Sequence, residues 1–235
     1  MTTAAVTFDY GLTLVGFKFP RSELLAALET FRPEIADELG RPAPEPAQIM
    51  AGVLEPLERD LAAFGEDEVA DYLEFYERGW SRAGLDLSRD LLFRILDAEQ
   101  RCWDQAVRVA PGALRTLDRL RGLGLRTAVA SNAPFPPAMM RRQMEGTGIA
   151  ARVDAVVLSS EVGRRKPAPE VYLAALAALH TPARQALHVG DRLLEDFRGP
   201  TAVGMRAVLC TALAEEPAPP GVPSIARLEE VEAVL

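Results

Sequence analysis

Short, nearly continuous runs of apolar residues recur along the chain, and each is bounded by glycine, asparagine or aspartate. The runs are AAVTFD (4–9), LRTAVASN (125–132), VDAVVLSS (153–160), ALHVGD (186–191) and MRAVLC (205–210). Strands that are covered on both faces have this composition, whereas a strand with one wet face alternates apolar and polar residues. The pattern therefore predicts buried strands of a parallel sheet.

Helical patterns separate the later runs. In PGALRTLDRLRGLG, the residues Leu114, Leu117 and Leu120 recur every three positions, and glycines close the segment. The segment KPAPEVYLAALAAL carries prolines in its first turn and then apolar residues at helical spacing. This alternation of strand and helix predicts an α/β fold with a doubly wound, Rossmann-like core and right-handed crossovers.

Residues 17–105 interrupt the alternation, because they contain no clear strand and several amphipathic segments. Their apolar faces comprise Leu24, Leu25, Leu28 and Phe31, then Val69, Tyr72, Leu73, Tyr76 and Trp80, and finally Leu91, Leu92, Ile95 and Leu96. We interpret this region as an all-helical insertion after the first strand. The chain is thereby predicted to comprise a core of residues 1–16 and 106–235 and a helical domain of residues 17–105.

The composition of the chain argues against some classes of binding partner. The net charge of −8 argues against a nucleic acid or an anionic membrane, since such partners require clustered lysine and arginine. The two cysteines, Cys102 and Cys210, are far apart and are expected to be reduced and packed. No signal peptide and no apolar stretch of membrane-spanning length is evident. We expect a cytoplasmic protein that is a monomer or a homodimer.

Polar residues follow the predicted strands at the places where the strands end. Asp9 ends the first run, Ser131 and Asn132 end the second, and Lys166 and Asp191 follow the third and fourth. The carboxyl ends of parallel strands meet at one edge of a sheet, which is where ligands bind in such folds. Carboxylates suit Mg²⁺, and a lysine beside them suits a dianionic group. The residues alone therefore favour a metal-assisted phosphoryl site.

Four segments in this order carry a family resemblance. FDYGLTL, AVASN, SSEVGRRKPAPEVY and HVGDRLLEDFRGPTAVGM resemble the four motifs of the haloacid dehalogenase-like hydrolase superfamily. The fourth segment is the most specific, because Asp191 and Asp196 stand five apart and Gly199 follows. The helical insertion after the first motif resembles the cap of subfamily I. The resemblance spans residues 5 to about 210 and implies a hydrolase that acts on a small phosphorylated metabolite.

The resemblance also implies roles for individual residues. Asp9 would be the nucleophile and would carry an aspartyl-phosphate intermediate. Asp9, Asp191 and the backbone carbonyl of Gly11 would bind Mg²⁺. The cap would close over the site and select the substrate.

Further residues would support this chemistry. The resemblance implies that Thr13, Ser131 and Asn132 position the transferring group. Lys166 would neutralise charge on Asp9 and on the phosphoryl oxygens. Asp196 would not contact the substrate itself but would hold metal-bound water or the lysine. We interpret His188 as a core histidine with satisfied hydrogen bonds and no part in general base catalysis.

The first motif departs from the family pattern Asp-x-Asp-Gly-Thr. The spacing from Asp9 to Thr13 is intact, but Gly11 replaces the second aspartate and Leu12 replaces the glycine. In the family's phosphatases that aspartate is the general acid and base, a role worth ~10²–10⁴ in rate. Glycine has no side chain for it. The period-2 alternation of the strand points Tyr10 away from Asp9, so Tyr10 is no substitute.

Three hypotheses follow from this departure. The first is a Mg²⁺-dependent phosphohydrolase with altered acid–base chemistry, whose leaving group needs no proton or takes one from elsewhere. The second is a 2-haloacid dehalogenase-type hydrolase, since those enzymes also lack the second aspartate. The third is a catalytically degenerate protein that binds a phosphorylated ligand or a protein partner. The presence of Asp9, Lys166 and Asp191 favours catalysis, or at least metal binding, over the third hypothesis. Asp191 argues against the second, because it belongs to a metal-type fourth motif and the dehalogenases work without metal. We therefore favour the first.

Overall fold

A single parallel sheet forms the centre of the fold. The computed structural model describes residues 2–62, 72–133 and 135–235. In the sheet the strand order is β5-β4-β1-β6-β7-β8, and every pairing is parallel. The strands are β1 (Ala5–Phe8), β4 (Arg126–Ser131), β5 (Ala155–Leu158), β6 (Ala186–Gly190), β7 (Arg206–Cys210) and β8 (Ser224–Ile225). The prediction of a parallel α/β core is confirmed, and each predicted run contains a strand.

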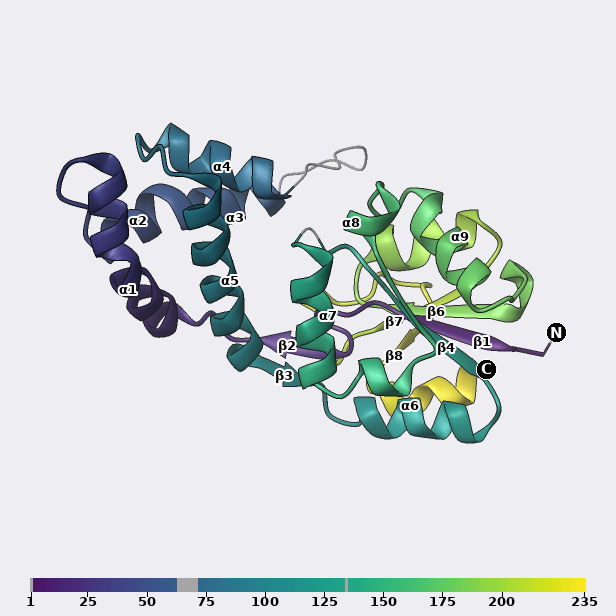
Figure 1. Ribbon diagram of the computed structural model, residues 1–235. Helices are drawn as coiled ribbons and strands as arrows, with labels where there is room; N and C mark the ends of the chain where they lie inside the picture. Colours follow the sequence, from purple (N-terminus) through teal and green to yellow (C-terminus); the bar gives the residue numbers. More distant parts are fainter. Residues whose placement is uncertain (1, 63–71, 134) are drawn as a thin grey trace. The chain divides into compact units, whose positions relative to one another are not determined.

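Helices cover both faces of this sheet (Figure 1). On one face lie α6 (Ala113–Gly122), α7 (Pro137–Gly146) and the 3₁₀ segment η5 (Leu228–Val234), whose apolar residues pack on Val6, Phe8 and Val129. On the other face α9 (Pro169–Ala178) packs through Tyr172 and Leu176. The short helices α8 (Ser159–Val162) and α10 (Gly199–Ala202) contact α9. Burial on both faces explains why the strands are apolar throughout.

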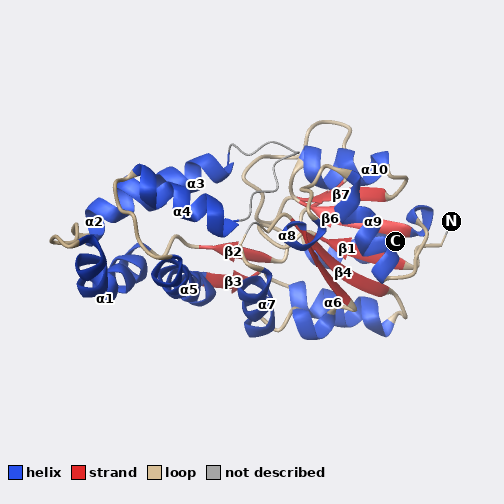
Figure 2. Cartoon of the chain, turned by 45° about the horizontal axis from the view of Figure 1, so that its top comes forward, coloured by secondary structure: helices blue, strands red, loops and turns tan. Residues whose placement is uncertain are grey.

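Short elements complete this part of the chain. Strand β2 (Val15–Phe17) pairs antiparallel with β3 (Val107–Val109), and the two flank the helical insertion in sequence (Figure 2). The remaining short helices are η2 (Ala150–Arg152), η3 (Ala183–Gln185) and η4 (Leu193–Arg198). Strands of three residues are too short to show a period of two, which is why the sequence pattern did not predict β2 and β3.

The insertion between β2 and β3 is helical over its described residues. It contains α1 (Arg21–Leu39), α2 (Pro46–Ile49), η1 (Met50–Leu54), α3 (Glu55–Ala62), α4 (Tyr72–Arg82) and α5 (Arg89–Ala106). Contacts divide the described chain into a sheet unit, residues 2–17, 107–133 and 135–235, and a helical unit, residues 18–62 and 72–106. Within the helical unit the predicted apolar faces of α1, α4 and α5 are buried or half-buried. Val69 lies outside the described residues.

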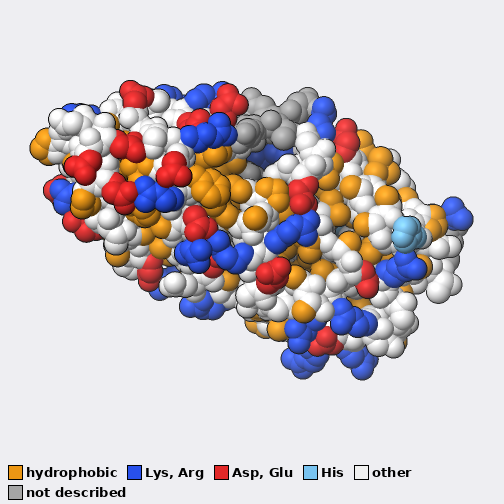
Figure 3. Space-filling view, viewed as in Figure 1, with side chains coloured by type: hydrophobic (Ala, Val, Ile, Leu, Met, Phe, Trp, Pro, Cys, Tyr) orange, Lys and Arg blue, Asp and Glu red, His pale blue; other side chains and the backbone are white. Residues whose placement is uncertain are grey.

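The surface of the helical unit carries both signs of charge. Acidic and basic side chains interleave on the face seen in Figure 3. The ion pairs of this unit include Arg32–Glu45 and Arg82–Asp60. Exposed pairs of this kind contribute about 0–1 kcal/mol each, so they solubilise more than they stabilise. Among the described helices, none combines the length and the apolar composition needed to cross a membrane.

Candidate active site

Asp9 lies at the point where the order in which the chain adds strands to the sheet reverses. It follows β1, which lies between β4 and β6, and its backbone N–H donates to the carbonyl of Val189 at 2.8 Å. The chain pairs β1 with β4 and extends outward to β5 before it returns to the other side of β1 as β6. Such switch points leave a crevice beyond the strand ends. Asp9 is 8% exposed there, so a buried strand delivers its carboxylate to the crevice with little solvent around it.

Lys166 joins two carboxylates. Its Nζ lies 2.6 Å from Asp9 Oδ1 and 2.6 Å from Asp196 Oδ1, and its side chain is 1% exposed. Asn132 holds the backbone of this lysine at both ends: its amide nitrogen donates to the Lys166 carbonyl at 2.9 Å, and its amide oxygen accepts from the Lys166 N–H at 2.7 Å. The loop after β5 is therefore fixed to the end of β4, which places the ammonium beside Asp9.

Asp196 anchors the turn after β6. Its Oδ2 accepts hydrogen bonds from the backbone N–H groups of Asp191 at 3.2 Å and Arg192 at 3.0 Å. A Cβ on Gly190 would stand 2.2 Å from Asp196 Cγ, so only glycine lets the carboxylate lie against the end of the strand. Asp196 is 1% exposed. It thus orients the segment that carries Asp191 while it binds Lys166.

Burial and charge act in opposite directions on these groups. Burial raises the pKa of Asp9, although the Lys166 ammonium opposes the shift. Burial likewise acts to raise the pKa of Asp196, but the Lys166 charge and a hydrogen bond from His188 outweigh it and hold that pKa well below its usual range. For Lys166 burial favours the neutral form, yet Asp196 and Asp9 outweigh it and raise the pKa. The lysine is therefore an ammonium, and Asp196 is ionised.

Three carboxylates are close enough to share a cation. Oxygens of Asp9, Asp191 and Asp196 lie within 4.8 Å of one another. Because both oxygens of Asp196 already accept hydrogen bonds, Asp9 and Asp191 are the two that are left to ligate a metal. Burial raises the pKa of Asp191 to about 6, and the charge of Asp196 adds to that shift. One or two carboxylates beside a substrate phosphate are the donors Mg²⁺ takes, so this set fits that ion.

The turn after Asp9 contains a backbone conformation that is typical of glycine, but the residue that adopts it is a leucine. Leu12 adopts a φ of +56°, a left-handed conformation that leucine seldom takes. Its N–H donates to the carbonyl of Val15 at 2.7 Å, which closes the turn. At Gly11 the φ is ordinary, and an added Cβ would meet only the Phe17 ring at 3.5 Å. The turn thus has room for a side chain at position 11.

The other predicted residues lie around this cluster. Thr13 is fully buried and its hydroxyl donates to Asp191 Oδ1 at 3.4 Å, while Ser131 ends β4 and is 6% exposed. The structure brings Thr13, Lys166, Asp191 and Asp196 into one network with Asp9. Asn132 contacts the backbone of Lys166, which is a supporting role. Contacts of Thr13, Ser131 and Asn132 with a substrate stay predictions, as does binding of a metal by the Gly11 carbonyl.

The sequence interpretation missed the residues that back this network. His188, placed in the core as predicted, contacts Asp196 through Nε2 at 3.1 Å and Thr7 through Nδ1 at 2.8 Å. Tyr172 of α9 packs edge-on against the His188 ring and donates its hydroxyl hydrogen to the Glu195 carbonyl. These contacts follow from the pairing of β1 with β6 and from the position of α9, neither of which shows in the local pattern.

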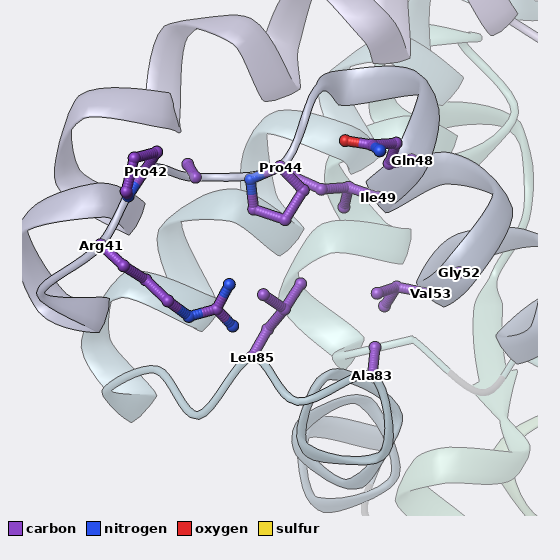
Figure 4. A pocket seen from close by; sticks show the side chains of 10 residues that line it. Arg41, Pro42, Pro44, Gln48, Ile49, Gly52, Val53, Ala83 and Leu85 are labelled. Atoms are coloured by element: carbon purple, nitrogen blue, oxygen red, sulfur yellow. The ribbon is translucent and has the colours of Figure 1, made fainter.

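A separate cavity lies within the helical unit. It has a volume of about 490 Å³ and is lined by residues of the 41–53 segment together with Ala83 and Leu85 (Figure 4). Apart from Arg41 and Gln48, its side chains are apolar or absent. None of the residues predicted to be catalytic lines it, so the proposed chemistry does not use this cavity.

Known proteins resemble this chain along most of its length. A family model described as haloacid dehalogenase-like hydrolase matches residues 18–204. The 2-haloacid dehalogenase of Pseudomonas syringae pv. Tomato DC3000 superposes with a TM-score of 0.71 at 23% identity, covering 100% of this chain and 98% of that one. At this identity the likeness concerns the fold.

Curated relatives match over a shorter segment. The ribulose-1,5-bisphosphate 5-phosphatase of Halopiger xanaduensis is 33% identical over 113 residues, which are 48% of this chain and 46% of the relative. The glyceraldehyde 3-phosphate phosphatase of Pyrococcus abyssi is 35% identical over 102 residues, 43% of this chain and 42% of the relative. The matches thus span less than half the length of these relatives. Taken with the family model and the fold, they show that the chain belongs to the haloacid dehalogenase-like hydrolases.

Proposed function

We propose that the protein is a Mg²⁺-dependent phosphohydrolase of small phosphorylated metabolites, with Asp9 as the nucleophile. The observation that carries the proposal is the bridge of Lys166 between Asp9 and Asp196, with the Asp191 carboxylate beside it. The bridge leaves a buried nucleophile next to a fixed ammonium, an arrangement suited to a dianionic substrate. The phosphatases among the relatives support the same class of substrate.

The proposed reaction has two steps. A carboxylate oxygen of Asp9 attacks phosphorus, the bond from phosphorus to the leaving oxygen breaks, and the leaving group departs with the bonding electrons. Water then attacks the aspartyl phosphate, which releases inorganic phosphate and restores Asp9. Asp9 and Asp191 would hold Mg²⁺, which supplies charge neutralisation at the phosphoryl oxygens. Lys166 keeps the negative charge of Asp9 and of the phosphoryl group from repelling each other.

Gly11 limits the substrates that such a site can use. A side chain at this position would be the one next to the departing oxygen, and glycine supplies none. The proposal therefore favours leaving groups that depart without a proton, such as the carboxylate of an acyl phosphate. An alkyl phosphate, whose leaving alkoxide needs a proton, would react more slowly by ~10²–10⁴ unless the acid comes from elsewhere.

Release of phosphate and of halide from a panel of metabolites tests the proposal. Wild type, Asp9→Asn and Gly11→Asp are each assayed with and without Mg²⁺. We expect Mg²⁺-dependent phosphate release that Asp9→Asn abolishes. Gly11→Asp should raise the rate on alkyl phosphates by about 10²-fold or more, since the turn accommodates a Cβ there.

The remaining outcomes select the alternatives. Halide release without metal would replace the proposal with a dehalogenase-type hydrolase. An inert wild type together with an active Gly11→Asp variant would indicate a degenerate binding protein that has lost turnover with its acid.

A further inference from the structure

We propose that His188 is a positioning residue for Lys166: as a neutral imidazole that carries its hydrogen on Nε2, it donates to Asp196 and so keeps the lysine shared between Asp196 and Asp9. The contact belongs to the fold itself. Its effect on turnover rests on the proposed function, and the two are tested separately below.

The histidine has one partner on each ring nitrogen. It lies in the middle of β6 and is fully buried, and its neighbour across the sheet is Thr7 of β1. Its Nδ1 lies 2.8 Å from the Thr7 hydroxyl and its Nε2 lies 3.1 Å from Asp196 Oδ1. With Tyr172 packed edge-on against the ring at 5.7 Å between centroids, the imidazole has a single orientation.

The hydrogen-bond partners decide where the ring hydrogen lies. The ionised Asp196 only accepts, so Nε2 must carry a hydrogen. The threonine hydroxyl either accepts or donates, so Nδ1 is free to accept from it, and one hydrogen on the ring satisfies both contacts. A second hydrogen would place an imidazolium in a buried site that already holds the Lys166 ammonium. Burial and that charge both lower the pKa of His188, although the Asp196 hydrogen bond opposes them.

The hydrogen bond from His188 affects Lys166 because both side chains bind the same oxygen of Asp196. Both bind Asp196 Oδ1, while the backbone N–H groups of Asp191 and Arg192 bind Oδ2. Removal of the histidine hydrogen bond would leave Lys166 as the one side chain on Oδ1. The oxygen would then attract the ammonium more strongly, and Asp9 would lose part of the positive charge that its chemistry requires.

Side-chain NMR tests the protonation of His188 and the position of Lys166. Assignment of the signals is simple, because the chain contains only two histidines and two lysines. In each pair one member is buried, His188 and Lys166, and the other is exposed, His180 and Lys18. Long-range proton–nitrogen correlation at pH 7.5 should show His188 as a neutral ring with hydrogen on Nε2. The Lys166 ammonium should give a protected nitrogen signal. Hydrogen on Nδ1, or an imidazolium, would overturn the proposal without any assay of activity.

Two amide substitutions separate the hydrogen bond that His188 donates from the space that its ring fills. In His188→Gln the amide nitrogen is as many bonds from the backbone as Nε2, so it still reaches Asp196; in His188→Asn the amide reaches only the Nδ1 position. The Lys166 ammonium signal should therefore move in His188→Asn and stay near its wild-type position in His188→Gln. Equal movement in both, or in neither, would refute the proposal.

The kinetic arm follows once turnover is established. We expect His188→Asn to lower kcat about 10–100-fold with a smaller change in KM, as loss of a supporting contact behind a reactive group does, and His188→Gln to restore most of the rate. Equal losses in the two variants would show that His188 only fills space. If wild type proves inert, the proposed function fails, whereas the NMR result still decides the position of the lysine.

Discussion

Two buried polar clusters, one in each unit of the molecule, accommodate buried carboxyl groups in different ways. In the sheet unit, Asp9 and Asp196 share the ammonium of Lys166. In the helical unit, Glu99 of α5 is 7% exposed and accepts a hydrogen bond from the Tyr76 hydroxyl at 2.8 Å. The rings of Tyr72 and Tyr76 stack with centroids 6.2 Å apart, so the surroundings of Glu99 are aromatic.

The consequence is a difference in charge. Burial raises the pKa of Glu99 to about 8; the Tyr76 hydrogen bond opposes this shift and the nearby Glu58 adds to it. Glu99 is therefore mostly protonated at neutral pH. Asp196 experiences burial too, but the lysine keeps it ionised. Asp196 thus stays charged because a buried cation lies beside it, whereas Glu99, whose described surroundings are aromatic, takes up a proton. Nucleophilic attack needs the charged form of Asp9, and there burial raises the pKa to about 7 although the Lys166 ammonium opposes the shift.

Removal of the cation should have the largest effect, because it makes the first cluster resemble the second. In Lys166→Met, Asp9 and Asp196 would be buried without their ammonium. We expect the free energy of unfolding at pH 7 to fall by about 3–5 kcal/mol, with phosphate release abolished. Urea denaturation measures the first effect, and Lys18→Met, which alters the exposed lysine, is the matched control with a change below about 0.5 kcal/mol.

A second substitution sharpens this test. Adding Asp196→Asn to Lys166→Met removes one of the orphaned charges and should recover part of the lost stability. A Lys166→Met protein as stable as wild type would contradict the idea that the ammonium is what keeps these carboxylates charged.

Substitution of Glu99 tests the other cluster and should have the next largest effect. Below pH 4.5 this carboxyl is protonated in both the folded and the unfolded state. Between pH 4.5 and about 8 the unfolded chain loses the proton while the folded chain keeps it, so stability falls as pH rises. Glutamine retains the shape and cannot ionise. At about 1.4 kcal/mol per pKa unit, the shift from 4.5 to about 8 corresponds to about 5 kcal/mol, so Glu99→Gln should be more stable than wild type by on the order of 5 kcal/mol at pH 8.5.

The pH dependence is what distinguishes this prediction from a general stabilisation. Thermal or urea unfolding at pH 4, 6 and 8.5 should show a gain that is absent at pH 4 and grows with pH. The exposed Glu215→Gln provides the control and should show no such growth. A gain of equal size at all three values would mean that the pKa of Glu99 is the same in the folded and the unfolded protein.

The two clusters also differ in how far the sequence predicted them. Strand ends are visible as apolar runs that stop at a polar residue, so the sequence alone predicts that Asp9 and Asp191 lie at one edge of the sheet. Glu99 follows Ile95 by four positions and Leu96 by three, so the helical period puts it on the predicted apolar face, but a glutamate is not a residue type that the apolar pattern counts.

Contacts between distant elements explain the rest of what was missed. His188 was correctly placed in the core, yet its partners depend on the register of β1 against β6, which pairs Thr7 with His188. Gly190 lies within the fourth apolar run, and only the position of Asp196 shows why a side chain cannot fit there. Strand β8 has two residues and carries no pattern at all.

The smallest predicted effect concerns the backbone of each unit. Glu99 lies in a regular helix, whereas Asp9 is followed by a turn in which Leu12 is held at a φ of +56°. Leu12→Gly and Leu12→Ala both remove the half-buried side chain, so their difference isolates the backbone. A left-handed conformation costs an alanine about 1 kcal/mol and glycine almost nothing, so Leu12→Gly should unfold at higher urea concentration than Leu12→Ala.

In η1 of the helical unit, where Gly52 has ordinary φ and open space around its Cα, Gly52→Ala should instead stabilise by about 0.4–1 kcal/mol. If alanine exceeded glycine at both positions, the turn would relax when Leu12 is removed, and the position of Asp9 would not depend on that strained residue.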